Sequence, residues 1–247
     1  MRPTWSDQRA TGFGGSLPPV VKTLLIANVA IFTFQLLAQA LARTRLDQMF
    51  GLVPFDVTHH FFLWQLATYL FLHGGIFHLA FNMLALWMFG GELEETWGSE
   101  RFARFYFVTG IGAGLCSVLA SWNSYIPIIG ASGAIYGLLA AYGILFPDRT
   151  LLLGFLIPIK AKWFVLILGL VAFWMSLSAS GDGVAHVAHL GGMLFGWLYL
   201  KGWRAGSGIR LPSWKAWRES RRQAKLRKKF RLYYRDTRGE DPNRDEE

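Results

Sequence analysis

Long apolar runs, separated by short polar or charged segments, recur along most of the chain. The first covers residues 20–41, which is enough for one bilayer crossing at ~20 residues per helix. The later runs predict five more spans, at residues 75–91, 101–122, 132–146, 163–178 and 184–203. The pattern therefore predicts an all-α polytopic membrane protein with six transmembrane helices.

Two segments between the runs are less regular. In residues 42–62, Arg43, Arg45 and Asp47 interrupt the apolar positions, which predicts an interfacial first outer loop with short amphipathic pieces. Residues 151–158 are apolar but brief and end at a proline, so we expect a loop or an extension of a span. The predicted domains are an N-terminal segment at 1–19, a membrane domain at 20–203 and a basic tail at 204–247.

The small number of charged residues and the distribution of lysine and arginine indicate a membrane protein and predict its orientation. Only 17% of the 247 residues are charged, and 15 of the 25 lysines and arginines lie from Lys201 onward. This distribution is typical of a membrane protein with a basic tail and not of a nucleic-acid binder. With both termini cytoplasmic, 23 basic residues lie inside and only Arg43 and Arg45 outside. We expect a multi-pass protein of a bacterial inner membrane, whose tail is either a solvated orientation signal or a ligand for anionic lipid or a partner.

Four polar side chains share one depth in this topology. Spans two, four and six all run from outside to inside. His78 and Asn82 lie near the outer end of the second, Ser132 starts the fourth, and His189 lies about one and a half turns into the sixth. At 1.5 Å per residue, all are within roughly 10 Å of the outer helix ends. Polar groups at this depth are costly and indicate a functional site.

Small residues can bring the histidine to the serine. His189, Gly192 and Gly196 lie on one face of the sixth span, and the G-x-x-x-G spacing allows another helix to approach closely. Gly137 offers a matching small residue on the fourth span. We therefore expect packing of these two spans to bring His189 within reach of Ser132.

The chemistry of this layer fits nucleophilic catalysis. A serine hydroxyl needs a base, and His189 can take the proton of Ser132. No carboxylate is well placed to orient the histidine: Asp182 lies in the outer loop and the glutamates after span two are at the opposite face. We predict a Ser–His dyad, with oxyanion donors from the Ser132 backbone N–H, His78 and Asn82.

Neighbouring residues are predicted to support the pair. Tyr136, one turn below the serine, can stack on the imidazole ring. Gly130 and Gly133 leave room for substrate backbone, and Gly137 lets the sixth span come close. His73 is expected to support the site from the loop side by hydrogen bonding.

Three motifs together resemble those of a known family. His78-x-x-x-Asn82, Gly130-x-Ser132-Gly133 and His189-x-x-Gly192-x-x-x-Gly196, in this order, resemble the rhomboid intramembrane serine proteases over residues 64–196. The resemblance implies a Ser–His dyad, an oxyanion pocket, cleavage of other proteins' transmembrane segments, and a mobile fifth span and outer loop that gate substrate entry.

Further positions match the family or depart from it. Tyr136 falls where the family has a tyrosine packed on the catalytic histidine, and Glu94-x-x-x-Gly98-Ser99 resembles its structural turn after span two. The family often has Trp-Arg in the outer loop, where this chain has Trp64-Gln65, a difference that bears on the polar anchoring of the loop. His186 is an alternative base, but only His189 has the H-x-x-G-x-x-x-G spacing.

Two other classes of function compete with the protease. A catalytically silent, client-binding relative typically lacks the serine or the histidine, and this chain keeps both. A transporter would show internal repeats and midplane ionisable groups, which the sequence lacks. With the single Cys116 and no H-E-x-x-H, we expect neither metal nor cofactor. The expected partners are the lipid bilayer and transmembrane protein substrates, with a small residue favoured before the cut, and no nucleic acid.

Overall fold

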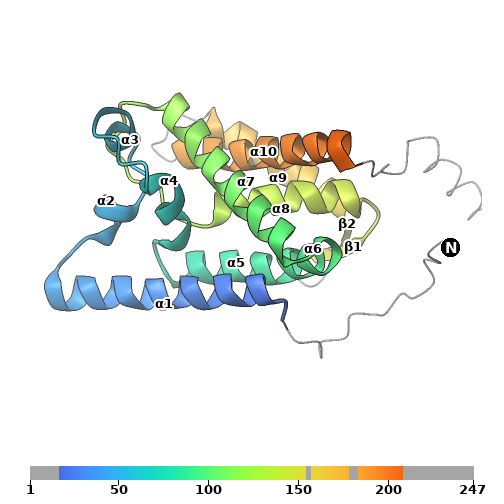
Figure 1. Cartoon of the computed structure of the whole chain (residues 1–247), viewed down its shortest axis with the longest axis horizontal. Coiled ribbons are helices and arrows are strands. Elements are labelled where there is room, and N and C mark those ends of the chain that lie inside the picture. Colours follow the sequence, from blue (N-terminus) through green and yellow to red (C-terminus); the bar gives the residue numbers. More distant parts are fainter. Residues whose placement is uncertain (1–16, 154–156, 178–182, 208–247) are drawn as a thin grey trace, which may run out of the picture. The chain divides into compact units, whose positions relative to one another are not determined.

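The structure is a computed structural model that describes residues 17–153, 157–177 and 183–207, most of them helical (Figure 1). They belong to a compact unit, Met1–Lys201, and to the first residues of a second unit, Gly202–Glu247. The predicted tail from 208 onward and Asp182 lie outside the described residues. The long helices are α1 (Pro19–Ala42), α5 (Ile76–Ala85) continuing through a π-helical turn (Leu86–Gly90) into α6 (Gly91–Trp97), α7 (Ser99–Ala120), α8 (Ser132–Leu145), α9 (Ala161–Ser176) and α10 (Gly183–Ser207).

Each of the six predicted spans corresponds to one of these helices, with most ends displaced by only one or two residues. Three helical stretches are long and apolar enough to cross a bilayer, namely Pro19–Ala42, Ile76–Trp97 and Ser99–Ala120. Within the described ranges, α8 and α9 are shorter apolar helices of 14 and 16 residues. The helical prediction is therefore confirmed, whereas six membrane crossings stay a prediction.

A buried carboxylate fixes the start of α1. Glu94 of α6 is 3% exposed and accepts the backbone N–H groups of Val20 at 2.9 Å and Val21 at 2.8 Å. The Ser99 hydroxyl donates to the same carboxylate at 2.6 Å, across a turn where Gly98 has φ +82°. A negative charge at these otherwise unpaired N–H groups is stabilising. The turn thus ties α1 to α6 and α7, and α1 also lies alongside α5 (Figure 1).

The segment between α1 and α5 consists of short helices: α2 (Leu46–Phe50), α3 (Pro54–His59), α4 (Gln65–Thr68) and a 3-10 turn (Tyr69–Phe71). The first two lie within residues 42–62, where the mixed pattern predicts short pieces, whereas the position of this outer loop at the membrane interface stays a prediction. Gln65 is fully buried, and its side-chain oxygen accepts the Val53 N–H at 2.9 Å. Gln65 therefore anchors the loop from the position where the family often has arginine.

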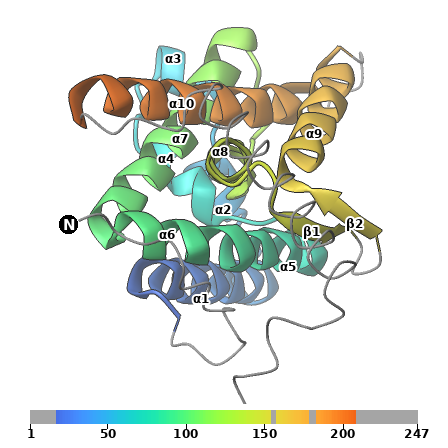
Figure 2. The same ribbon diagram turned by 90° about the vertical axis from the view of Figure 1, so that its right-hand side faces the viewer.

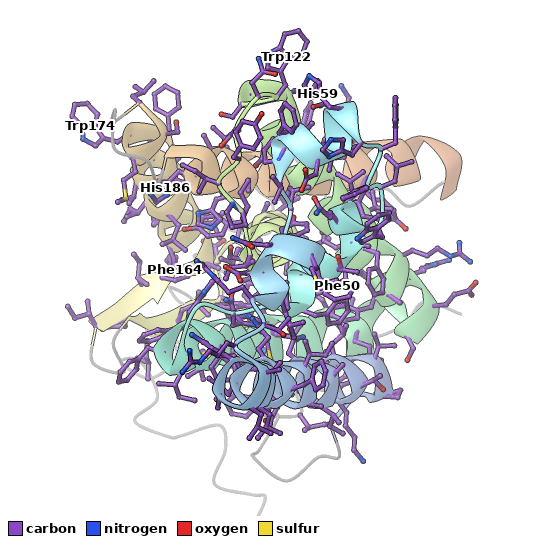
Figure 3. The ribbon with its side chains drawn as sticks, turned by 90° about the vertical axis from the view of Figure 1, so that its left-hand side faces the viewer. Phe50, His59, Trp122, Phe164, Trp174 and His186 are labelled. Atoms are coloured by element: carbon purple, nitrogen blue, oxygen red, sulfur yellow. The ribbon has the colours of Figure 1, made fainter. Side chains whose placement is uncertain are left out.

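The same loop is joined to the segment between α7 and α8. Leu52 and Ile128 exchange two backbone hydrogen bonds of 2.9 Å, and the Thr58 hydroxyl donates to the Trp122 carbonyl at 3.0 Å. Figure 3 shows the neighbouring His59 and Trp122 at one end of the molecule. These bonds hold the segment that leads into Ser132 against the outer loop.

The expectation for residues 151–158 was wrong. Of these, residues 151–153 and 157–158 belong to two antiparallel strands, β1 (Thr150–Leu153) and β2 (Ile157–Lys160), and residues 154–156 lie outside the described ranges. The sequence pattern could not predict these strands, because a short apolar run does not distinguish a strand from a helix. The hairpin leads directly into α9, where the Ala161 N–H donates to the Arg149 carbonyl at 2.8 Å.

Helix α8 lies at the centre of the helical body. Seen end-on in Figure 2, it is surrounded by α5, α7, α9 and α10. Its residues from Gly133 to Tyr142 are buried except for Tyr136, which is half-buried. The core around α8 therefore fixes where the helix, and the serine at its start, can lie.

Candidate active site

Ser132 is the first residue of α8 and follows a sharply turned backbone. Gly130 has φ +124°, a conformation that side-chain-bearing residues rarely adopt, and its N–H donates to the Tyr69 carbonyl at 2.9 Å. The Ser132 N–H makes no hydrogen bond to a described residue, as expected in a first helical turn. The half-buried Ser132 therefore has two groups available at the start of α8, its side-chain hydroxyl and its backbone N–H.

His189 of α10 meets this serine. Its Nε2 lies 2.8 Å from Ser132 Oγ, a hydrogen-bond distance. The Tyr136 ring stacks on the imidazole with centroids 4.2 Å apart and planes 3° from parallel. The structure thus brings together Ser132, Tyr136 and His189, as the sequence analysis expected. His186, the alternative base, makes no hydrogen bond to Ser132 among the described residues.

The hydrogen bond assigns roles to the two histidine nitrogens. If the serine donates its proton to Nε2, the neutral ring carries its own proton on Nδ1. Nδ1 is buried and has no hydrogen-bond partner within the described part of the chain. No described carboxylate orients the ring, so the geometry is that of a Ser–His pair held by packing.

His78 and Asn82 converge on the turn before the serine. The His78 Nε2 lies 2.7 Å from the position that a Cβ on Gly130 would occupy, and Asn82 Nδ2 lies 3.8 Å from it. Asn82 is 6% exposed and uses Nδ2 to donate to the His78 carbonyl at 3.0 Å, which leaves one amide hydrogen. Both side chains therefore offer nitrogen atoms beside Gly130, two residues before Ser132.

The backbone of Gly74 sets the tautomer of His78. Its N–H donates to His78 Nδ1 at 3.3 Å, so that nitrogen is unprotonated and the neutral ring carries its hydrogen on Nε2. Nε2–H is the group that points toward Gly130. Sequence reasoning missed this contact, and only the neighbouring glycines at 74 and 75 hint at a backbone approach.

His73 supports the site differently from the prediction. Neither ring nitrogen makes a hydrogen bond to a described residue, and the ring instead contacts His78 edge-on, with centroids 5.1 Å apart. Its backbone N–H donates to Gln35 of α1 at 3.1 Å. Burial, with a smaller contribution from His78, lowers the pKa of His73 to about 4, so the ring is neutral at neutral pH.

Two glycines have other roles than the predicted ones. A Cβ on Gly130 would meet the His78 ring, and one on Gly133 would lie 2.7 Å from Ala113 Cβ and 3.0 Å from the Tyr69 hydroxyl. These spaces are thus occupied by the protein itself and not left for substrate backbone. The Tyr69 hydroxyl also donates to the Gly110 carbonyl at 2.7 Å. Tyr69 therefore braces the serine turn, a role that no sequence motif indicated.

The approach of α10 depends on Gly192 and Gly196. A Cβ on Gly192 would lie 1.9 Å from the Gly133 carbonyl oxygen, and one on Gly196 would lie 3.0 Å from that of Gly137. Gly137 itself faces α7, because its Cβ would lie 2.6 Å from Thr109 Cβ. Helix α10 nevertheless rests on the backbone of Gly137, whose Cα would lie 3.2 Å from a Cβ on Gly196, so the expected close approach is present on the side away from α7.

In the described ranges, no group of three or more His, Cys, Asp or Glu side chains is placed to hold a metal ion. The helices and the serine–histidine contact define a polytopic helical protein with a hydrolase-like site.

Comparison with known proteins gives the family. Residues 60–204, more than half of the chain, match the rhomboid domain family. The chain is 37% identical over 133 residues to rhomboid protease GluP of Bacillus subtilis, covering 54% of this chain and 24% of that protein. It is 35% identical over 151 residues to rhomboid protein 1, mitochondrial, of Saccharomyces cerevisiae, covering 56% and 41%. It is 32% identical over 135 residues to the putative rhomboid protease YdcA of B. subtilis, covering 55% and 64%.

The matched segments thus span less than two thirds of these relatives' own length. The chain belongs to the rhomboid family and is a multi-pass helical membrane protein.

Proposed function

We propose that the protein is an intramembrane serine endopeptidase that cleaves transmembrane segments of other membrane proteins near the outer leaflet. Ser132 is the nucleophile and His189 the general base. The observation that carries the proposal is the 2.8 Å contact between Ser132 Oγ and His189 Nε2 at the start of a central helix. The rhomboid proteases among its relatives support the same reaction class.

The proposed reaction uses these groups in turn. Ser132 Oγ attacks the substrate carbonyl while its proton passes to His189 Nε2, and the imidazolium then protonates the leaving amine. The oxyanion is bound by the Ser132 N–H at the start of α8, His78 Nε2–H and the remaining Asn82 amide hydrogen. Water then hydrolyses the acyl-enzyme, with His189 again as the base.

The proposal includes a topology. Six helices cross the membrane, both termini are cytoplasmic, and the first outer loop lies at the interface. The membrane domain at 20–203 carries the site, and the basic tail at 204–247 faces the anionic leaflet. A bacterial inner membrane fits this charge distribution. The proposed substrates carry helix-weakening residues near the outer leaflet, since the scissile carbonyl must be freed from its helix.

Cleavage of a model single-span substrate by the purified protein in detergent tests the function. We expect cleavage by the unsubstituted chain and none by Ser132→Ala or His189→Ala. Labelling by a fluorophosphonate probe, absent in Ser132→Ala, shows activation of this serine independently of substrate binding. Full cleavage by Ser132→Ala would end the proposal, and full cleavage by His189→Ala would end the assignment of the base.

A further inference from the structure

His186 lies one helical turn before His189 on α10, and the two rings touch. Their centroids are 5.7 Å apart and their planes cross at 73°. His186 is half-buried and is labelled in Figure 3. We propose that His186 is a positioning residue for His189: its imidazole orients the His189 ring and stabilises the imidazolium formed during attack. This inference rests on the proposed function.

The need for such a residue follows from the His189 Nδ1 atom. When Ser132 gives its proton to Nε2, the ring becomes positively charged and carries N–H groups at both nitrogens. Nδ1 is buried without a hydrogen-bond partner in the described ranges. A buried charge without polar contacts is unfavourable. Among the described residues, the side chains in contact with the ring are therefore the candidates for the role that a carboxylate has in a triad.

Tyr136 supplies only part of that support. Its ring is parallel to the imidazole at 4.2 Å, so it covers one face and is attractive to a cation through its π electrons. A stacked ring cannot accept an N–H that points in the plane of the imidazole. The orientation of the ring about its own axis is thus left open by Tyr136.

His186 is the other described ring in contact with His189, and it stands nearly perpendicular to it. The two rings meet edge to face, and an imidazole that turns its unprotonated nitrogen or its π face toward the neighbouring ring favours positive charge there. The i, i+3 spacing on one rigid helix keeps the two rings together. The contact therefore restrains His189 and stabilises its protonated form.

Two substitutions of His186 test the role in the purified full-length protein. His186→Ala is expected to lower kcat and the second-order rate of fluorophosphonate labelling of Ser132 about tenfold, a change equivalent to about 1.4 kcal/mol, with KM unchanged. His186→Asn is expected to recover most of both rates, because its amide oxygen is an acceptor. His60→Ala removes an exposed histidine of the outer loop, and Val187→Ala trims a neighbouring half-buried side chain of α10. Both controls are expected to keep the original rates.

The outcomes separate this role from packing and from the function itself. Unchanged kcat and labelling in His186→Ala would overturn the proposal. So would a rise in KM alone, an equal loss in Val187→Ala, or a lowered unfolding temperature that His186→Asn does not restore. If the unsubstituted protein cleaves substrate and reacts with the probe, and both rates are unchanged in the two His186 variants, only the positioning role fails. If it neither cleaves nor labels, the proposed function fails instead.

Discussion

Substituting Gly192 by alanine tests whether close approach of α10 creates the catalytic pair. The new Cβ would lie 1.9 Å from the Gly133 carbonyl oxygen, whereas Cβ atoms essentially never come closer than 3.0 Å to another heavy atom. The obstacle is backbone of the central helix, which cannot rotate away as a side chain can. Helix α10 must therefore move outward by about 1 Å or more, since interiors are close-packed.

That movement reaches the active site. His189 is three residues before Gly192 on the same helix, so it moves with the backbone. A shift of about 1 Å takes the 2.8 Å distance between Ser132 Oγ and His189 Nε2 well beyond the 3.2 Å limit of a good hydrogen bond. Misplacement of this size lowers catalysis on the order of 100-fold, equivalent to about 2.7 kcal/mol of transition-state stabilisation.

The assay is kcat/KM for a single-span substrate in detergent, with the unfolding temperature measured on the same samples. Gly196→Ala provides a graded comparison, because its Cβ would lie at 3.0 Å from the Gly137 carbonyl oxygen, and a smaller loss is expected. Gly91→Ala is the matched control, since nothing lies within 4 Å of its Cβ position. A folded Gly192→Ala protein with activity within threefold of the original would refute the reasoning.

Three further outcomes are expected. Glu94→Gln should lower the free energy of unfolding by about 2 kcal/mol, because one acceptor of buried backbone N–H groups is lost. Glu95→Gln, on the exposed side of α6, is the control and should have little effect in the same thermal unfolding assay. Tyr136→Phe should keep kcat near the original, and Tyr136→Ala should lower it about 2- to 10-fold, the value of an aromatic contact of about 0.5–1.5 kcal/mol. For His73, the pKa of about 4 in the folded protein lies below the ordinary value of 6.5. Between pH 4 and pH 6.5 the unfolded chain therefore binds more protons than the folded protein, and the free energy of unfolding falls as pH is lowered from 6.5 to 4. His73→Leu should therefore reduce the slope of unfolding temperature against pH in this window, and an unchanged slope would contradict the assignment.

The helices of this chain were predictable because apolar runs longer than a typical strand depend only on local composition. The contact between Ser132 and His189 was also predictable, since the two residues share a depth once the direction of each predicted span is fixed. The hairpin at 150–160 was not, because strand pairing is a contact between two segments and leaves no helical or alternating signature in a short apolar run. The local pattern of apolar residues therefore predicts helices more reliably than it predicts which segments pair with each other.

The glycines show where sequence reasoning stops. The motif identifies Gly130, Gly133 and Gly137 as positions of close approach, but not what approaches them. The direction of each missing Cβ depends on the rotation of the helix, and the three directions lead to His78, Ala113 and Thr109. Likewise, the change to Gln65 is visible in the sequence, whereas the Val53 N–H that it satisfies is found only in the fold.

The proposed dyad depends on two separate constraints. On the serine side, the left-handed turn at Gly130 is held by the Tyr69 carbonyl and covered by the His78 ring. On the histidine side, the distance is set by the backbone contact of Gly192 with α8. Since neither constraint involves a carboxylate, a single added methyl group can separate the nucleophile from its base while both stay in the sequence. If the proposed dyad is the catalytic site, we expect that Ser132 and His189 alone do not identify an active chain, and that the glycines which hold the two residues together must be compared as well.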